Sequence, residues 1–532
     1  MKSKKIKIIA TSLLLTLFVS SCQKGNLLSD PNAINANAVV PVSLILNHIT
    51  ANFVRNDEMP FGLNGGDFIA TKVDQFQVSN YLKYWGFNEY SWSYSGQNYE
   101  ILKYAVQLET QANAQYGANS KYAAIAKFFR AYSAIWLSQR VGDVPMTQAG
   151  DPLVYKTPKY DTQHDVYKNS LKLLDDANTL LGTLTSATPG VAFDSGDIFG
   201  FTNLQWQKLI NTYRLRVLIS LSKRADDNAD LNIKTQFAAI LAAPATYPIM
   251  TANSDNMIYK FVASNPYPIF ATGNASYNNF MNVGKVVLDL TTANKDPRTY
   301  LMATPITTTN VGLFTNYVGA DPATSLATLQ TVAATGVYSF FNAARYLGNA
   351  TGSTVEPFIF IGYPEMCFNI AEGINRGWAP TLAATDAKTW YDKGITASFS
   401  NFGLNTAANS NVTISDVAGK SLGTVTTDNA TFLANIAYNV GNPATALTQI
   451  LQQKYVAFFM NSGWEAFYNC RRTGVPALSA GGSGTGTTGN VIPKRWLYPL
   501  DEINANSANY KAAIASQYGG TDDVMKDIWL TK

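Results

Sequence analysis

The chain has 532 residues, of which 46% are hydrophobic, 12% aromatic and only 14% charged. Typical soluble domains contain about 25% charged residues, so this composition excludes disorder caused by excess charge and allows a large apolar core. The formal charge is +4, and it falls to zero without the four lysines at positions 2, 4, 5 and 7. A neutral chain without a long basic run is a poor candidate for binding nucleic acid, because such binding depends on neutralising phosphates. Three cysteines and two histidines exclude a disulfide framework and argue against a structural zinc site.

Residues 1–21 are predicted to be a lipoprotein signal peptide. Lysines come first, an apolar run follows from 8 to 19, and two serines precede Cys22, which is the three-part pattern of a secretory signal. The apolar run is shorter than the roughly 20 residues that span a bilayer, and no later segment has such a run. Residues 19–22 (VSSC) resemble a bacterial lipobox, so we expect Cys22 to be acylated, with palmitate among its acyl chains. The alternative is a plain signal that happens to contain a cysteine.

The next segment, 22–40, is polar and rich in turn-forming residues, and we interpret it as a lipidated tether. A single body is then expected over 41–532, because no charged linker interrupts it. Apolar residues at helical spacing predict a scaffold of paired helices over 41–224. Helices are expected over 41–56, 97–116 and 203–224, after a cap at Ser120, and after a cap at Asp161 or Thr162.

An unusually aromatic segment lies between the first two predicted helices. Residues 81–99 contain eight aromatic residues in nineteen, whereas about two are expected at 12%. Aromatic rings pack against the C–H faces of sugars or against peptide side chains, and tyrosine and tryptophan add hydrogen bonds without charge. We therefore predict that this segment contacts a neutral ligand, with the alternative that its rings pack in the core. The predicted contacts are Tyr81, Trp85, Tyr90, Trp92 and Tyr94.

Helical periodicity fades over 225–355, which is predicted to be rich in loops, and returns at 364–377, 386–401 and 443–470. Segment 479–490 is expected to be a surface loop. Its G-x-G-x-x-G pattern at 484–489 lacks the preceding strand and the following helix that a dinucleotide site needs. The fold is therefore expected to be mainly all-α, with tetratricopeptide-like helix pairs and a loop-rich second half.

No catalytic constellation, metal site or cofactor motif is predicted. The acidic residues at 226, 227 and 230 lack EF-hand spacing, so a solvated loop is favoured over a calcium site. His48 and His164 have no nucleophile partner in a recognisable motif. Glu365 and Glu372 share one helical face, and Cys367 is interpreted as a buried small hydrophobe. Cys470 precedes two arginines that could lower its thiol pKa, but a buried helix end is favoured.

Several segments together resemble the SusD/RagB-like family of nutrient-binding outer-membrane lipoproteins of Bacteroidota. The matching segments follow the family order along the whole chain. They are the lipobox with the turn at 30–32, GDVP at 142–145, the Trp206 helix with Arg214 and Arg216, DPR at 296–298, the helix at 363–377, KGI and AS at 393–398, RRTGVP at 471–476 and the tail at 493–509.

The resemblance implies an α-helical binding protein with four tetratricopeptide-like helix pairs, and not an enzyme. It implies capture of an oligosaccharide or peptide and delivery to a SusC-like TonB-dependent transporter in the outer membrane. The protein would be held at the membrane through its lipid anchor only, on the cell surface, although residues 23–26 lack the acidic residues that often accompany surface export. Two alternatives from other classes are a lipid-anchored helical-repeat scaffold for protein partners and a secreted hydrolase.

Overall fold

Antiparallel helices make up most of the chain that the structure describes. This computed structural model describes residues 39–54, 69–79, 96–262, 281–346, 356–480 and 492–532. Residues from Val42 to Lys532 form one compact unit, and the description below refers to that unit. Along the described ranges, no helix is long and apolar enough to cross a membrane.

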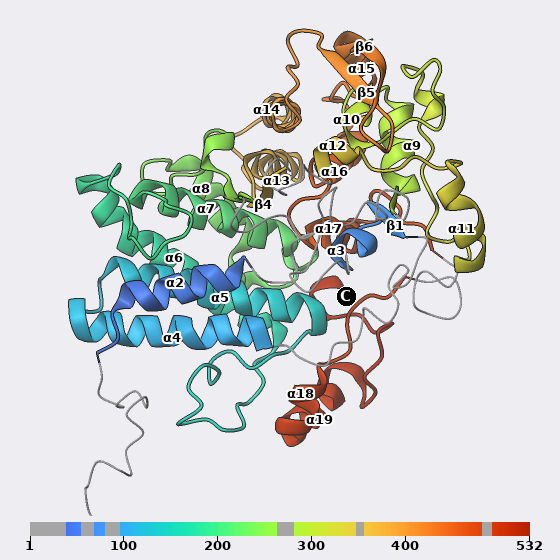
Figure 1. Cartoon of the computed structure of the whole chain (residues 1–532). Coiled ribbons are helices and arrows are strands. Elements are labelled where there is room, and N and C mark those ends of the chain that lie inside the picture. The colour runs from blue at the N-terminus through green and yellow to red at the C-terminus, as the bar shows by residue number, and fades with distance from the viewer. Residues whose placement is uncertain (1–38, 55–68, 80–95, 263–280, 347–355, 481–491) are drawn as a thin grey trace, which may run out of the picture. The chain divides into compact units, whose positions relative to one another are not determined.

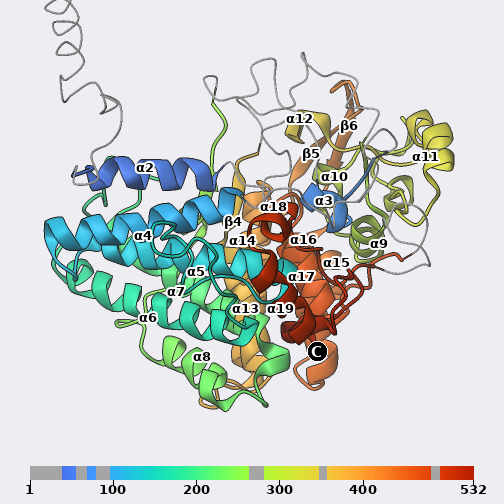
Figure 2. The same ribbon diagram turned by 90° about the horizontal axis from the view of Figure 1, so that it is seen from below.

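The N-terminal half of this unit is a stack of helices in which each helix packs against the next. Figure 2 shows them as successive layers between α2 and α8. The stack confirms the expected scaffold of paired helices, and it continues beyond residue 224 into α8. Its members are α2 (Val42–Phe53), α4 (Gly96–Tyr116), α5 (Lys121–Val141), α6 (Gln163–Ala187), α7 (Asn203–Ser220) and α8 (Ile233–Ala242).

Side-chain caps set where three of these helices begin. The Ser120 hydroxyl accepts a hydrogen bond from the backbone N–H of Ala123 and so caps α5, as predicted. Of the two candidates for capping α6, Thr162 is the cap, and Asp161 instead accepts hydrogen bonds from the preceding loop. Thr202 and Gln205 form a reciprocal capping box at the start of α7.

Aromatic rings fill the core of the stack. Trp206 is fully buried, and its ring meets Phe128 edge-on at a centroid distance of 5.8 Å. The indole N–H of Trp206 donates to the Asp197 carboxylate at 2.8 Å, which satisfies its polar atom inside the core. Phe53 at the end of α2 packs against Tyr132 at 4.8 Å, which ties α2 to α5.

The C-terminal half begins after α8, and residues 225–355, which span that boundary, contain more helices than the loop-rich expectation predicted. That expectation was incomplete: α8 buries Ile233, Phe237 and Ile240 at helical spacing, and α9 is also helical. The central helix α13 packs against α7, α14 and α16 and so connects the two halves (Figure 1). The helices of this half are α9 (Lys285–Ala293), α10 (Thr299–Met302), α11 (Leu326–Val332), α12 (Ala343–Tyr346), α13 (Tyr363–Asn375), α14 (Ala384–Asn401), α15 (Asn429–Asn435), α16 (Pro443–Ala457), α17 (Glu465–Thr473), α18 (Leu500–Ala505) and α19 (Ser507–Tyr518).

The helical pattern expected over 443–470 is divided between two helices, because the chain turns sharply between α16 and α17. Met460, Ser462 and Gly463 all have left-handed backbone angles, with φ of 61°, 61° and 58°. A left-handed residue cannot continue a right-handed helix, so α16 ends and α17 starts in a new direction.

Three small antiparallel ladders complete the described fold, together with the short helix α3 (Ile69–Val73). Two of them pair segments that are far apart in sequence, which the apolar pattern alone could not match, and the third is a local hairpin. The pairs are β1 (Gln77–Ser79) with β3 (Met281–Val283), β2 (Met257–Tyr259) with β4 (Phe358–Ile361), and β5 (Asn411–Ser415) with β6 (Ser421–Thr426).

Candidate functional site

The residues predicted to bind the ligand and the lipid lie outside the described residues. Tyr81, Trp85, Tyr90, Trp92 and Tyr94 fall within 80–95, Cys22 falls within 1–38, and most of the segment 479–490 falls within 481–491. Described elements flank residues 80–95, because β1 ends at Ser79 and α4 begins at Gly96, so the last four residues of the aromatic segment 81–99 belong to α4. Ser79 pairs with Met281 across the ladder.

A pocket with about 600 Å³ of space, part of it open to solvent, lies where β4, the end of α12, the end of α14 and the turn after α16 meet. Five of its twelve lining residues are aromatic, and a mainly apolar wall with a few polar groups is typical of ligand sites. Its lining residues are Phe261, Arg345, Tyr346, Glu356, Pro357, Phe358, Ile359, Asn401, Phe402, Phe459, Met460 and Asn461.

The rings of the pocket are locked against one another. Phe459 stacks on Phe341 with centroids 5.7 Å apart, and the Tyr346 ring meets Phe459 edge-on at 5.6 Å. Phe358 packs edge-on against Phe360 at 4.7 Å. Rings held in this way present fixed apolar edges, so binding a ligand would cost little side-chain entropy.

One ion pair supplies the strongest polar groups of the pocket. The Arg345 guanidinium lies 2.9 Å from the Glu356 carboxylate and donates to the backbone carbonyls of Asn401 and Phe402 at 2.9 and 3.1 Å. It also lies over the Phe402 ring at 4.8 Å. Burial raises the pKa of Glu356 above its ordinary value, and the charge of Arg345 opposes that shift. The pair is neutral as a whole, so the pocket offers hydrogen bonds without a net field.

The wall of the pocket is built by the turn that the sequence pattern did not predict. Asn461 accepts a hydrogen bond from the Ile359 N–H at 2.9 Å, and the Ser462 N–H donates to the Ile359 carbonyl at 2.8 Å. These bonds fasten the left-handed turn to strand β4. The turn therefore fixes the positions of Phe459 and Met460 in the pocket.

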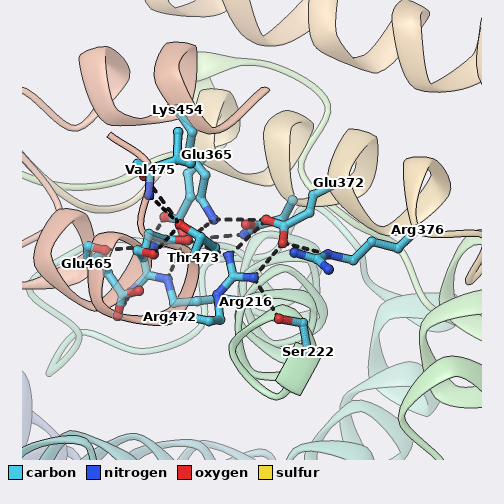
Figure 3. A network of polar contacts seen from close by, with 12 residues as sticks. Arg216, Ser222, Glu365, Glu372, Arg376, Lys454, Glu465, Arg472, Thr473 and Val475 are labelled. Atoms are coloured by element: carbon cyan, nitrogen blue, oxygen red, sulfur yellow. Dashed lines mark hydrogen bonds and ion pairs between the residues drawn. The ribbon is translucent and has the colours of Figure 1, made fainter. Parts of the chain in front are cut away.

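A second polar centre, shown in Figure 3, is a buried network of charges on helix α13. Arg216 from α7 binds Glu365 through Nε at 2.6 Å, and Arg472 from α17 binds both oxygens of Glu372 at 2.5 and 2.9 Å. Arg376 adds a contact to Glu372 at 2.9 Å.

Burial alone would raise the pKa of Glu372, but Arg472 and the neighbouring cations hold that pKa at about 2. Burial lowers the pKa of Lys454, whose ammonium lies 4.0 Å from Glu372. A permanently ionised, fully paired carboxylate is unsuited to proton transfer, so this network acts as a structural joint between α7, α13 and α17.

The remaining candidates for chemistry are engaged in surface or core contacts. Asp226 pairs with Lys234, and Asp230 pairs with Lys168 at 2.9 Å. Within the described ranges, no three histidine, cysteine or acidic side chains come together where they could hold a metal ion. Burial raises the pKa of the Cys470 thiol despite the neighbouring arginines, and burial raises that of Cys367 to about 12. Both thiols are therefore inert, as their interpretation as buried residues predicts.

Comparison with known proteins gives a consistent family match. Residues 32–499 match a SusD-like family model described as starch-binding and associating with the outer membrane. No curated protein matches the sequence significantly. A SusD homologue from Bacteroides fragilis is 26% identical, with a TM-score of 0.77 over 93% of this chain and 100% of its own.

Two further solved structures are similar along nearly their whole length. An outer membrane protein from Bacteroides vulgatus, whose name connects it with nutrient binding, is 26% identical, with a TM-score of 0.72 over 93% of this chain and 100% of its own. A chitin-binding SusD homologue from Flavobacterium johnsoniae is 20% identical, with a TM-score of 0.67 over 92% of this chain and 98% of its own. At that identity the likeness concerns the fold alone.

Proposed function

The chain belongs to the SusD-like family, and from this premise we propose that it captures a neutral oligosaccharide at the outer membrane and passes it to a SusC-like TonB-dependent transporter. SusD-like proteins are binding proteins and not enzymes. The observation that carries the proposal is the aromatic pocket around the Arg345–Glu356 pair. Sugars bind to such surfaces because their C–H faces pack on rings while their hydroxyls need neutral hydrogen-bonding partners.

The aromatic segment before α4 is proposed to extend this binding surface. Tyr81, Trp85, Tyr90, Trp92 and Tyr94 would add ring faces and polar tips of the same kind as those in the pocket. The low overall charge of the chain supports a neutral ligand, because an anionic ligand is usually steered by a complementary field.

Acylation of Cys22 is proposed to hold the protein at the outer membrane. Each buried methylene of an acyl chain contributes about 0.8 kcal/mol, so two or more chains anchor a protein stably. The polar residues 23–40 would then act as a tether between the lipid and the folded unit. A body tethered in this way can stay beside a membrane transporter and deliver its ligand at high local concentration.

Isothermal titration calorimetry on the mature chain carrying Cys22→Ser tests the proposal. The ligands are panels of neutral oligosaccharides and of mixed peptides. We expect a saccharide to bind, and we expect Trp85→Ala and Trp92→Ala to weaken it by about tenfold each, because stacking and buried ring area contribute on the order of 1–3 kcal/mol. Glu356→Gln keeps the size of the side chain and removes a charged acceptor, so a loss of about fivefold or more is expected.

Tyr116→Ala is the matched control, because Tyr116 is an aromatic residue 59% exposed at the far end of α4. This variant is expected to bind like the wild type. Binding of peptides only, or unchanged saccharide affinity in all three site variants, would contradict the proposal. Turnover of an oligosaccharide by pure protein would favour a hydrolase instead.

A further inference from the structure

The loop between α5 and α6 is held rigidly at its base although it carries no helix or ladder of its own. Val144 and Asp161 form a β-bridge, with N···O distances of 3.2 and 3.0 Å in the two directions. The Asp161 carboxylate also accepts hydrogen bonds from the backbone N–H groups of Met146 and Thr147 at 2.8 and 2.9 Å. The two sides of the loop are therefore fixed to each other.

Helices α18 and α19 hold the returning side of this loop. Asn506 donates to the Pro158 carbonyl at 2.8 Å, and Asn509 donates to the Thr157 carbonyl at 3.1 Å. The Tyr160 hydroxyl donates to Glu502 at 2.6 Å. Figure 1 shows the loop below α4 and beside α18 and α19.

The tip of the loop presents a run of apolar side chains to solvent. Leu153 is 92% exposed, Val154 is 64% exposed and Tyr155 is 41% exposed. The tip is ordered, because Asp151 accepts hydrogen bonds from the N–H groups of Val154 at 3.2 Å and Tyr155 at 2.9 Å. A contiguous exposed apolar patch on an ordered support is typical of an interaction site.

We propose that this tip inserts shallowly into an anionic lipid surface and so gives the folded unit a second contact with the membrane. Three side chains on a projecting tip fall well short of the roughly 800 Å² per partner that a stable protein interface buries. Shallow lipid insertion needs far less area, and tyrosine beside lysine is the composition preferred at the membrane–water interface. The exposed Lys156 and Lys159 follow the tip directly and complement anionic headgroups.

The inference rests on the anchorage proposed above, because a unit tethered through Cys22 already lies beside lipid. A weak contact between the loop tip and the lipid is then sufficient, because the tether keeps the tip near the membrane at a high effective concentration. The tether alone would leave the unit free to rotate, whereas a second contact at residues 153–155 would orient it towards the bilayer.

Flotation with vesicles of phosphatidylethanolamine and phosphatidylglycerol tests the inference on the mature chain carrying Cys22→Ser. We expect the chain without further substitutions to partition onto the vesicles. The double variant Leu153→Ser/Val154→Ser should have a partition coefficient lower by about tenfold or more. Both residues are exposed, so the fold should survive, and circular dichroism checks this. Leu313→Ser is the matched control, because Leu313 is 54% exposed on a different loop, and it is expected to partition like the wild type.

Three results would overturn the inference: no partitioning of the wild type, equal partitioning of the double variant, or an equal loss in the Leu313→Ser control. A protein occupant would be indicated instead if the double variant lost co-purification with a membrane transporter while its vesicle binding stayed unchanged. Oligosaccharide titration is read on the same Cys22→Ser variants, and palmitate labelling is read on matching variants that keep Cys22. If one of the three overturning results appears while oligosaccharide binding and labelling remain intact, the second membrane contact fails and the proposed function stands.

Discussion

Replacing Glu372 by glutamine should destabilise the fold by about 3 kcal/mol. Glu372 is fully buried, and Arg472, Arg376 and Lys454 surround its carboxylate. The interval between the ordinary glutamate pKa of 4.5 and the value of about 2 in the fold corresponds to roughly 3 kcal/mol, at about 1.4 kcal/mol per pKa unit. Removing one partner of a buried pair typically costs about 3–5 kcal/mol, because the remaining charges stay buried without compensation.

Urea unfolding at pH 7 measures this effect. Glu100→Gln is the matched control, because Glu100 is half-exposed and pairs with His48 at 3.2 Å. Its effect should stay within about 0.5 kcal/mol. The folded-state pKa of Glu372 is depressed, so its contribution is complete above pH 4.5 and is lost as the pH falls towards 2. The difference in the free energy of unfolding between the wild type and Glu372→Gln should therefore decrease as the pH falls from 4.5 towards 2. A difference in the free energy of unfolding below about 1 kcal/mol at pH 7 would refute the reasoning.

Two further stability predictions concern the packing of the helices. Gly373→Ala should destabilise the protein by about 1–3 kcal/mol in thermal or urea unfolding, because the added Cβ would lie 2.2 Å from the Phe237 ring; an unchanged midpoint would contradict this packing. Trp206→Phe should cost about 1–3 kcal/mol, because it removes one of the three hydrogen-bond donors to the buried Asp197 carboxylate. An equal cost of Trp206→Phe in the wild type and in an Asp197→Asn background would show that this hydrogen bond contributes nothing.

The helix scaffold is readable from the sequence because its signals are local. Val42, Ile45 and Phe53 recur at helical spacing, and they are buried in α2 as the pattern predicts. Ser120 precedes a run of helix-forming residues and caps α5. Helix α8 was missed although Ile233, Phe237 and Ile240 carry the same spacing, because the surrounding segment is dominated by small and polar residues.

The described pocket could not be predicted, because its parts meet only through tertiary contacts. Arg345 and Glu356 pair across a stretch of chain that has no periodic pattern. Strand β4 is buried on both faces, so its apolar run looks the same as a buried helix segment. The turn at Asn461, Ser462 and Gly463 did carry a signal, since these residue types favour turns. The aromatic contacts at 81–94 stay a prediction, because they lie outside the described residues.

The most direct test of the proposed function is a crystal structure of the mature chain carrying Cys22→Ser, bound to the best neutral oligosaccharide of the panel. The account predicts that sugar rings pack on aromatic side chains of the pocket around the Arg345–Glu356 pair, of the segment 81–94, or of both. It also predicts a sugar hydroxyl within hydrogen-bonding distance of Arg345 or Glu356. A saccharide bound on the outer face of the helix stack, away from both aromatic surfaces, would contradict it. So would a crystal at saturating oligosaccharide in which no sugar is bound.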